Sequence, residues 1–96
     1  MSVVIVGGNE CMARRYEELC ASYACTAKVF VKNLRGIQNM GEPDLLVLFT
    51  STMSHKMLHL ANGHAKRKNI PIARSPQSSV TALKNILDAH VEGRRV

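Results

Sequence analysis

The chain of 96 residues contains 46% hydrophobic and 21% charged residues, a composition that indicates one small folded domain and argues against disorder. Its longest apolar run is far shorter than the ~20 residues of a membrane span. The N-terminus lacks the pattern of a signal peptide, so we expect a cytoplasmic protein. A formal net charge of +6 favours anionic partners without choosing among them. Because so short a chain buries only a small core, we also expect a homodimer.

The first strand is predicted at Val3–Val6, where every residue is apolar. Such a strand is typical of a parallel sheet whose two faces are both covered by helices. Gly7 and Gly8 permit a tight turn after the strand, and Asn9 is a favourable N-cap for a helix over about residues 11–22. Strand, glycine turn and helix start together predict a site for an anion or a nucleotide.

The other elements follow from the same periodicities. Alternating residues predict an edge strand at 27–31, and residues 33–42 allow only one or two helical turns. Residues 45–49 are apolar throughout and predict a central strand beside the first one. A helix over about 54–67 with Asn69 as its C-cap, a short strand at 70–73 and a helix over about 79–91 complete the domain. The stripes expected to face the core are Met12, Tyr16, Leu19, Cys20 and Tyr23 in the first helix, and Val80, Leu83, Ile86, Leu87 and Val91 in the last.

This alternation of strands and helices predicts an α/β fold. Right-handed crossovers place helices on both faces of a small open parallel four-stranded sheet with strand order 2-1-3-4, a flavodoxin-like or receiver-like layout. Residues 1–92 are expected to form a single domain, and residues 93–96 a frayed basic tail.

Open parallel sheets bind ligands beyond the carboxyl ends of their strands, where the strand order reverses. Three polar loops are expected to converge at that crevice, each next to a helix N-terminus. The candidate ligand-binding residues in these loops are Gly7, Gly8, Asn9, Glu10, Thr50, Ser54, His55, Lys56, Arg74, Ser75 and Ser78. The structural alternative is that Asn9, Ser54 and Ser78 are simply helix caps.

Several familiar site types are excluded. The Gly7-Gly8 pair belongs to no GxGxxG, and the chain has no GxxxxGK[ST], so neither a dinucleotide fingerprint nor a P-loop is present. A receiver domain would need an aspartate at the end of the strand that here ends in Phe49-Thr50, so a phosphoacceptor is missing. No carboxylate lies between Ser51 and Ile72, which excludes an HExxH site.

Histidine and cysteine offer further alternatives. His55 and His59 are four residues apart and share a helix face, so they are candidate ligands for a metal or a haem iron. Exposed histidines without a ligand are the commoner case. Cys11 stands near a helix start, where a thiol becomes more reactive, although a half-buried structural cysteine is the simpler interpretation. The three cysteines lack CxxC spacing, so a disulfide framework is not expected.

A basic set follows the central strand and gives a weak indication of nucleic-acid binding, against the alternative of a solvated helix end. Its members are Lys56, Lys66, Arg67, Lys68 and Arg74. The scarcity of aromatic residues, 4% of the chain without tryptophan, argues against a protein that stacks single-stranded bases.

Five blocks in order carry a resemblance over nearly the whole chain. They are VVIVGGNE at 3–10, LLVLFT at 45–50, SHKM at 54–57, AKRKNIP at 65–71 and RSPQSS at 74–79. In these blocks the chain resembles a small bacterial domain-of-unknown-function family. The resemblance implies a small cytoplasmic α/β domain and no established reaction or cofactor. The family's recurrent polar positions correspond to candidate residues named above, and an arginine is common where this chain has Cys11.

The leading hypothesis is therefore a regulatory or ligand-binding module that holds a small phosphate- or carboxylate-bearing ligand in the crevice. A metal or haem protein using His55 and His59, and a nucleic-acid-binding module, are the alternatives. An enzyme that uses His55 with Glu10 is a further alternative, which requires a pocket able to exclude water.

Overall fold

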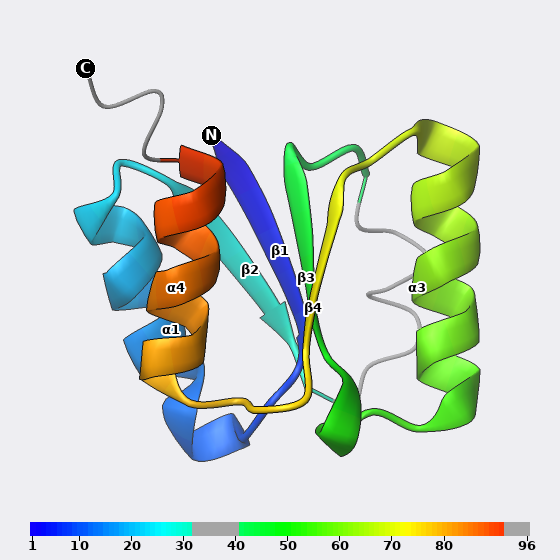
Figure 1. Ribbon diagram of the computed structural model, residues 1–96, viewed down its shortest axis with the longest axis horizontal. Helices are drawn as coiled ribbons and strands as arrows, with labels where there is room; N and C mark the ends of the chain where they lie inside the picture. Colours follow the sequence, from blue (N-terminus) through cyan, green and yellow to red (C-terminus); the bar gives the residue numbers. More distant parts are fainter. Residues whose placement is uncertain (32–40, 92–96) are drawn as a thin grey trace.

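The computed structural model describes residues 1–31 and 41–91, which form a parallel sheet between two helical layers (Figure 1). The sheet order is β2-β1-β3-β4, and every neighbouring pair is parallel, as predicted. The strands are β1 (Ser2–Gly7), β2 (Thr26–Phe30), β3 (Leu45–Phe49) and β4 (Ile72–Ser75). α1 (Ala13–Ser22) and α4 (Val80–Val91) cover one face, and α3 (His55–Lys68) covers the other. The predicted open α/β fold is confirmed.

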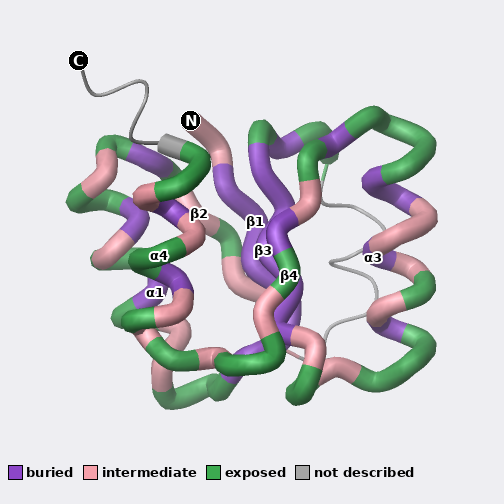
Figure 2. The backbone as a smooth tube through the Cα atoms, viewed as in Figure 1, coloured by how far each residue is buried: buried purple, intermediate pink, exposed green. Residues whose placement is uncertain are grey.

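The core lies on both faces of the two central strands (Figure 2). Alternate residues along a strand point to opposite faces, and each face here meets a helical layer. Val3, Ile5 and Val47 pack toward α1 and α4, whereas Val4 and Leu46 pack toward α3. Burial on both faces explains why β1 and β3 contain no alternating polar residues.

The predicted helical stripes are confirmed where the structure describes them. Tyr16 and Cys20 of α1 are fully buried, as are Leu83 and Leu87 of α4. The remaining predicted positions pack against this core while partly buried: Met12, Leu19, Tyr23, Val80 and Ile86. The side chain of Val91 lies outside the described residues, as do most of the predicted helical turns within 33–42. The prediction of a single domain over 1–92 with a frayed tail at 93–96 stays a prediction.

Three helix caps follow the sequence and one differs. Asn9 accepts a hydrogen bond from the Cys11 amide at 3.0 Å and caps a 3₁₀ turn at Glu10–Met12, so the helix predicted over about 11–22 is this turn followed by α1 from Ala13. Ser54 accepts a hydrogen bond from the Met57 amide at 3.1 Å and caps α3. Asn69 ends α3 in the left-handed conformation, as expected of a C-cap. The N-cap of α4 is Ser79 rather than Ser78, because the Ser79 Oγ accepts a hydrogen bond from the Ala82 amide at 3.1 Å.

β1 extends one residue beyond the predicted strand at each end, and two other strands are shifted along the chain. β2 begins and ends one residue earlier than expected, at Thr26–Phe30. β4 begins at Ile72 and runs to Ser75 instead of covering residues 70–73. Pro71 has no N–H to donate to the sheet, and only its carbonyl takes part, accepting a bond from the Leu46 amide at 2.9 Å. This shift places Arg74 and Ser75 inside the strand.

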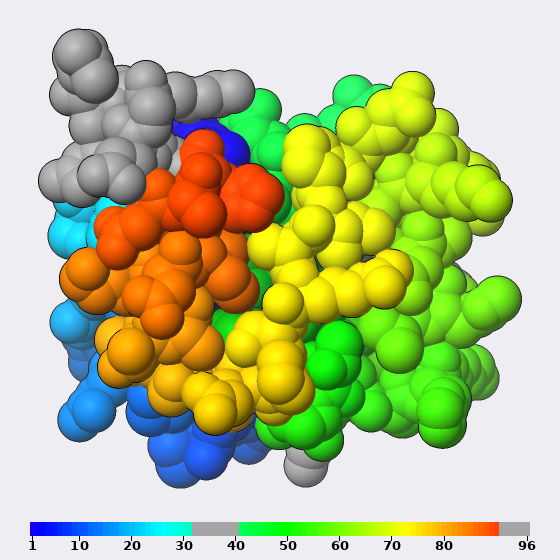
Figure 3. Space-filling view, viewed as in Figure 1, coloured from blue at the N-terminus to red at the C-terminus, as the bar shows by residue number. Residues whose placement is uncertain are grey.

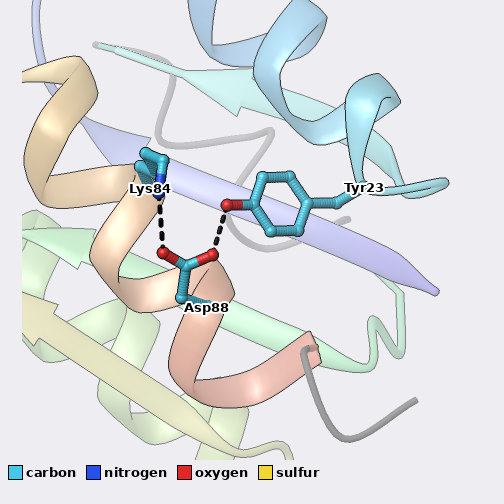
Figure 4. Close-up of polar contacts among 3 residues, drawn as sticks. All are labelled: Tyr23, Lys84 and Asp88. Carbon is cyan, nitrogen blue, oxygen red and sulfur yellow. Dashed lines mark hydrogen bonds and ion pairs between the residues drawn. The ribbon is translucent and has the colours of Figure 1, made fainter. Parts of the chain in front are cut away.

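The end of α1 is tied to α4 by a polar cluster on the helical layer (Figure 4). The Tyr23 hydroxyl donates to one carboxylate oxygen of Asp88, and the Lys84 ammonium lies 2.9 Å from the other. The hydrogen bond and the charge of Asp88 raise the pKa of Lys84. Tyr23 is therefore positioned to hold the two helices of this layer together.

Replacing Tyr23 with phenylalanine should lower the free energy of unfolding by about 1–2 kcal/mol, because it removes a hydrogen bond to a charged acceptor. Urea unfolding measures the loss. The control is Ser22→Ala. The Ser22 hydroxyl donates to the Leu19 carbonyl at 2.6 Å, a hydrogen bond within α1 that does not join α1 to α4. Equal losses in the two variants would contradict the role of Tyr23 in joining α1 to α4.

Candidate functional site

The turn after β1 is in close contact with the end of β3 and with α1. Gly7 and Gly8 have φ angles of +89° and +86°, which favour glycine. A Cβ on Gly7 would lie 2.9 Å from the Phe49 carbonyl oxygen, and one on Gly8 would lie 3.0 Å from the Tyr16 ring. The Gly8 amide donates to the Thr52 hydroxyl at 2.6 Å, and that hydroxyl donates to the Phe49 carbonyl at 2.9 Å. The ends of β1 and β3 are therefore joined through one side chain.

A pocket of about 320 Å³ opens beside this turn, at the carboxyl ends of the strands along the lower edge of Figure 1. Its walls come from the turn after β1, the end of β2, the short 3₁₀ turn η2 (Thr50–Thr52) and the loop before α4. The lining residues are Gly8, Asn9, Glu10, Cys11, Val31, Thr52 and Ser78. The pocket therefore lies in the crevice where an open parallel sheet binds its ligands.

Four of the predicted residues line this pocket: Gly8, Asn9, Glu10 and Ser78. The Ser78 carbonyl accepts a hydrogen bond from the buried Tyr16 hydroxyl, which fixes that wall to α1. Glu10 lies in the short 3₁₀ turn η1 (Glu10–Met12) that leads into α1, and among the lining residues that the structure describes it provides the only charged side chain. None of the described lining residues is a cation.

The other predicted residues lie outside the pocket lining. Thr50 donates to the Ser75 carbonyl at 3.4 Å, and the Ser75 hydroxyl bonds to Gln77 within its own turn. Arg74 donates to the Asn62 side chain of α3 at 2.9 Å. Gly7 is buried behind the turn, and Ser54, His55 and Lys56 form the start of α3 on the other side of the sheet. The structure thus divides the predicted crevice between the two helical layers.

Three lining residues were not among the predicted ligand-binding residues. Thr52 lies between the predicted residues Thr50 and Ser54, and its bond to the Gly8 amide is what ties it to the turn after β1. The sequence indicates Cys11 as a candidate reactive thiol, and its exposed position beside the N-cap Asn9 accounts for its place in the wall. Val31 follows an edge strand and carries no sequence signal of a site.

The histidines do not form a cluster in the described chain. His55 and His59 are both exposed on α3, and within residues 1–31 and 41–91 no group of three or more histidine, cysteine or acidic residues could hold a metal ion. His64 is buried, with its Nε2 2.7 Å from the Gly41 carbonyl oxygen. A metal or haem site at His55 and His59 stays a prediction.

The three thiols differ strongly in access. Cys11 is exposed, whereas Cys20 and Cys25 are buried, and burial raises the pKa of Cys20 to about 12. Because the thiolate is the nucleophile, we expect one thiol, Cys11, to react rapidly with a disulfide reagent in the native protein. The other two should react only on unfolding. A rapid phase of more than one equivalent, or one that persists in Cys11→Ser, would contradict this assignment.

Comparisons with known proteins concern the family and not the ligand. The search of curated proteins and the search of solved structures give no match. Within the described residues, no helix is long and apolar enough to cross a membrane. A family model described as an uncharacterised protein conserved in bacteria, DUF2325, matches residues 2–90. This match agrees with the resemblance carried by the sequence blocks, and the chain belongs to the DUF2325 family.

Proposed function

We propose that the domain binds a small ligand carrying a phosphate or carboxylate group in the pocket beside Gly8. The observation that carries this proposal is the convergence of residues following β1, β2 and β3 with Ser78 on one pocket of about 320 Å³. Pockets for small molecules have volumes of roughly 300–1,000 Å³. The position at the reversal of strand order supports the same conclusion.

The chemistry of the walls restricts the ligand further. Asn9 and Glu10 lead into the 3₁₀ turn η1, and backbone N–H groups at such a start can donate to an anionic group. The Glu10 carboxylate accepts hydrogen bonds and repels a second anion. We therefore expect a ligand with one anionic end and with hydroxyl or amino donors at the other, such as a sugar phosphate or a hydroxy acid.

A thermal-shift experiment with a blocked pocket tests the proposal. Cys11→Phe would place a ring in the pocket from an exposed position, and Cys11→Ser is the matched control that keeps its volume. The screen uses sugar phosphates, nucleoside monophosphates and hydroxy acids, with inorganic phosphate as the anion that lacks an organic hydroxyl or amino group. Ligand at 100 times its Kd should stabilise the wild type by about 2.7 kcal/mol, a shift of several degrees.

We expect a ligand that raises the melting temperature of the wild type and of Cys11→Ser but not that of Cys11→Phe. A ligand that shifts Cys11→Phe as much as the wild type binds elsewhere and would contradict the pocket assignment. The rate of Cys11 labelling gives an independent readout, because an occupied pocket should slow it. The expected homodimer is tested in the same samples by light scattering against the chain mass of 10.6 kDa.

A further inference from the structure

The outer face of α3 has a charge pattern that the ligand pocket does not use. No aspartate or glutamate occurs between Asp44 and Asp88, and α3 lies within this stretch. α3 forms the outer layer on its side of the sheet, with no described element beyond it (Figures 1 and 3). We define the outer face of α3 by its residues His55, Lys56, His59, Gly63, Lys66 and Arg67.

Helical geometry puts these residues on one side. The buried residues Met57, Ala61 and Ala65 pack on the sheet, and the outer face lies opposite them because each residue advances about 100° around the axis. All its members except the half-buried Gly63 are exposed. Lys56 and Arg67 are about 16 Å apart along the axis, at 1.5 Å per residue.

The cations of this face are free of ion pairs in the part of the chain that the structure describes. In the described residues, Lys56, Lys66 and Arg67 have no ion-pair partner, whereas Lys68 at the helix end lies 3.5 Å from Glu42. Arg74 adds a further guanidinium at the flank of α3, where it bonds to Asn62. Unpaired cations in a stretch without carboxylates create a positive field that attracts a polyanion.

A glycine in the middle of this face is a second, independent observation. Gly63 lies inside α3, where glycine is among the least favourable residues. Its φ is not positive, and a Cβ there would meet none of the described residues within 4 Å, so neither the backbone conformation nor packing within the described residues requires glycine. His59, Lys66 and Arg67 are its neighbours at helical spacings of three and four. A missing side chain among cations lets an external backbone approach the helix closely.

We propose that the outer face of α3 binds the phosphate backbone of a nucleic-acid duplex without reading its sequence. Several features favour a duplex over other polyanions. The face lacks the aromatic residues on which single-stranded bases stack or on which protein partners usually dock. Its apolar residues point to the sheet, so it lacks the apolar side that a membrane-surface helix inserts.

Fluorescence anisotropy with a labelled 20-base-pair DNA duplex, and with its RNA equivalent, tests this proposal. We expect a Kd of about 10⁻⁴–10⁻⁶ M at physiological salt, as for non-specific binding. Lys66→Gln with Arg67→Gln should weaken binding at least tenfold and should reduce the slope of log K against log salt by about 0.9 for each lost phosphate contact. The matched control, Arg14→Gln with Arg15→Gln, removes the same charge from exposed positions on α1 and should change Kd less than twofold.

Gly63→Gln separates binding from folding. This variant keeps the net charge and should raise the melting temperature, because glutamine favours the helix and the space is open. It should nevertheless weaken duplex binding several-fold. Unchanged binding in Gly63→Gln, equal losses in the two double variants, or no duplex binding by the wild type would overturn the proposal. So would tighter binding to the single strand or to phosphatidylglycerol vesicles. None of these results depends on the pocket beside Gly8.

Discussion

Alanine in place of Gly7 should destabilise the domain by about 4 kcal/mol. Two destabilising effects combine. A side chain at a φ of +89° costs roughly 1–3 kcal/mol, and steric overlap of the new Cβ with its neighbours costs roughly another 1–3 kcal/mol. The new Cβ would lie 2.9 Å from the Phe49 carbonyl oxygen, a backbone atom of a central strand that cannot move as a flexible side chain can. Because small domains have only about 5–15 kcal/mol of stability, this loss should appear as a large drop in the urea midpoint.

Two other glycines separate these costs. Gly41 also has a positive φ, +76°, but a Cβ there would meet nothing within 4 Å, so Gly41→Ala should lose only about 1 kcal/mol. Gly63 has neither constraint, and alanine there should gain up to about 1 kcal/mol. If Gly7→Ala lowered the free energy of unfolding no more than Gly41→Ala does, the close contact at the end of β3 would not contribute to stability.

The sequence predicted the sheet well because its two central strands carry an unambiguous signal. Val3–Val6 and Leu45–Phe49 are apolar at every position, which is required only where helices cover both faces. Right-handed crossovers with helices on both faces then favour the order 2-1-3-4, and the structure has it. The caps at Asn9 and Ser54 follow equally well, since a cap depends on residues within one helical turn.

The lining of the candidate pocket was predicted less completely because it depends on which face of a strand each residue occupies. The predicted strand at 70–73 left Arg74 in a loop at the crevice. In the structure Arg74 lies within β4, directly after Ala73, whose side chain packs toward α1 and α4. Neighbouring residues of a strand point to opposite faces, so Arg74 is directed to α3 and reaches Asn62. β4 lies two residues later in the chain than predicted, after Pro71. For this reason Arg74, the main predicted cation, lies in the strand and not at the pocket.

Loss of the Phe49 ring should have a comparably large effect. Phe49 is fully buried at the end of β3, and its ring centroid lies 5.4 Å from that of Tyr16 at an angle of 45°. Phe49→Ala removes this packing and leaves a cavity between the sheet and α1, so we expect a loss of about 3–5 kcal/mol. Phe49→Leu keeps most of the volume and should lose about 1 kcal/mol in the same urea titration. Similar losses in the two variants would contradict a cavity at this position.

The same side chain should also control the pocket, because it packs on Tyr16 and Tyr16 holds the Ser78 wall through its hydroxyl. The Phe49 carbonyl is linked to the Gly8 amide through Thr52. In Phe49→Leu, which stays folded, we therefore expect faster hydrogen exchange at the Gly8 amide, with little change at the Leu46 amide, which is bonded to Pro71 in the sheet. Uniform acceleration at both amides would mean that Phe49 supports the sheet as a whole. A selective change at Gly8 would mean that the end of β3 and the pocket turn open together as one local unit.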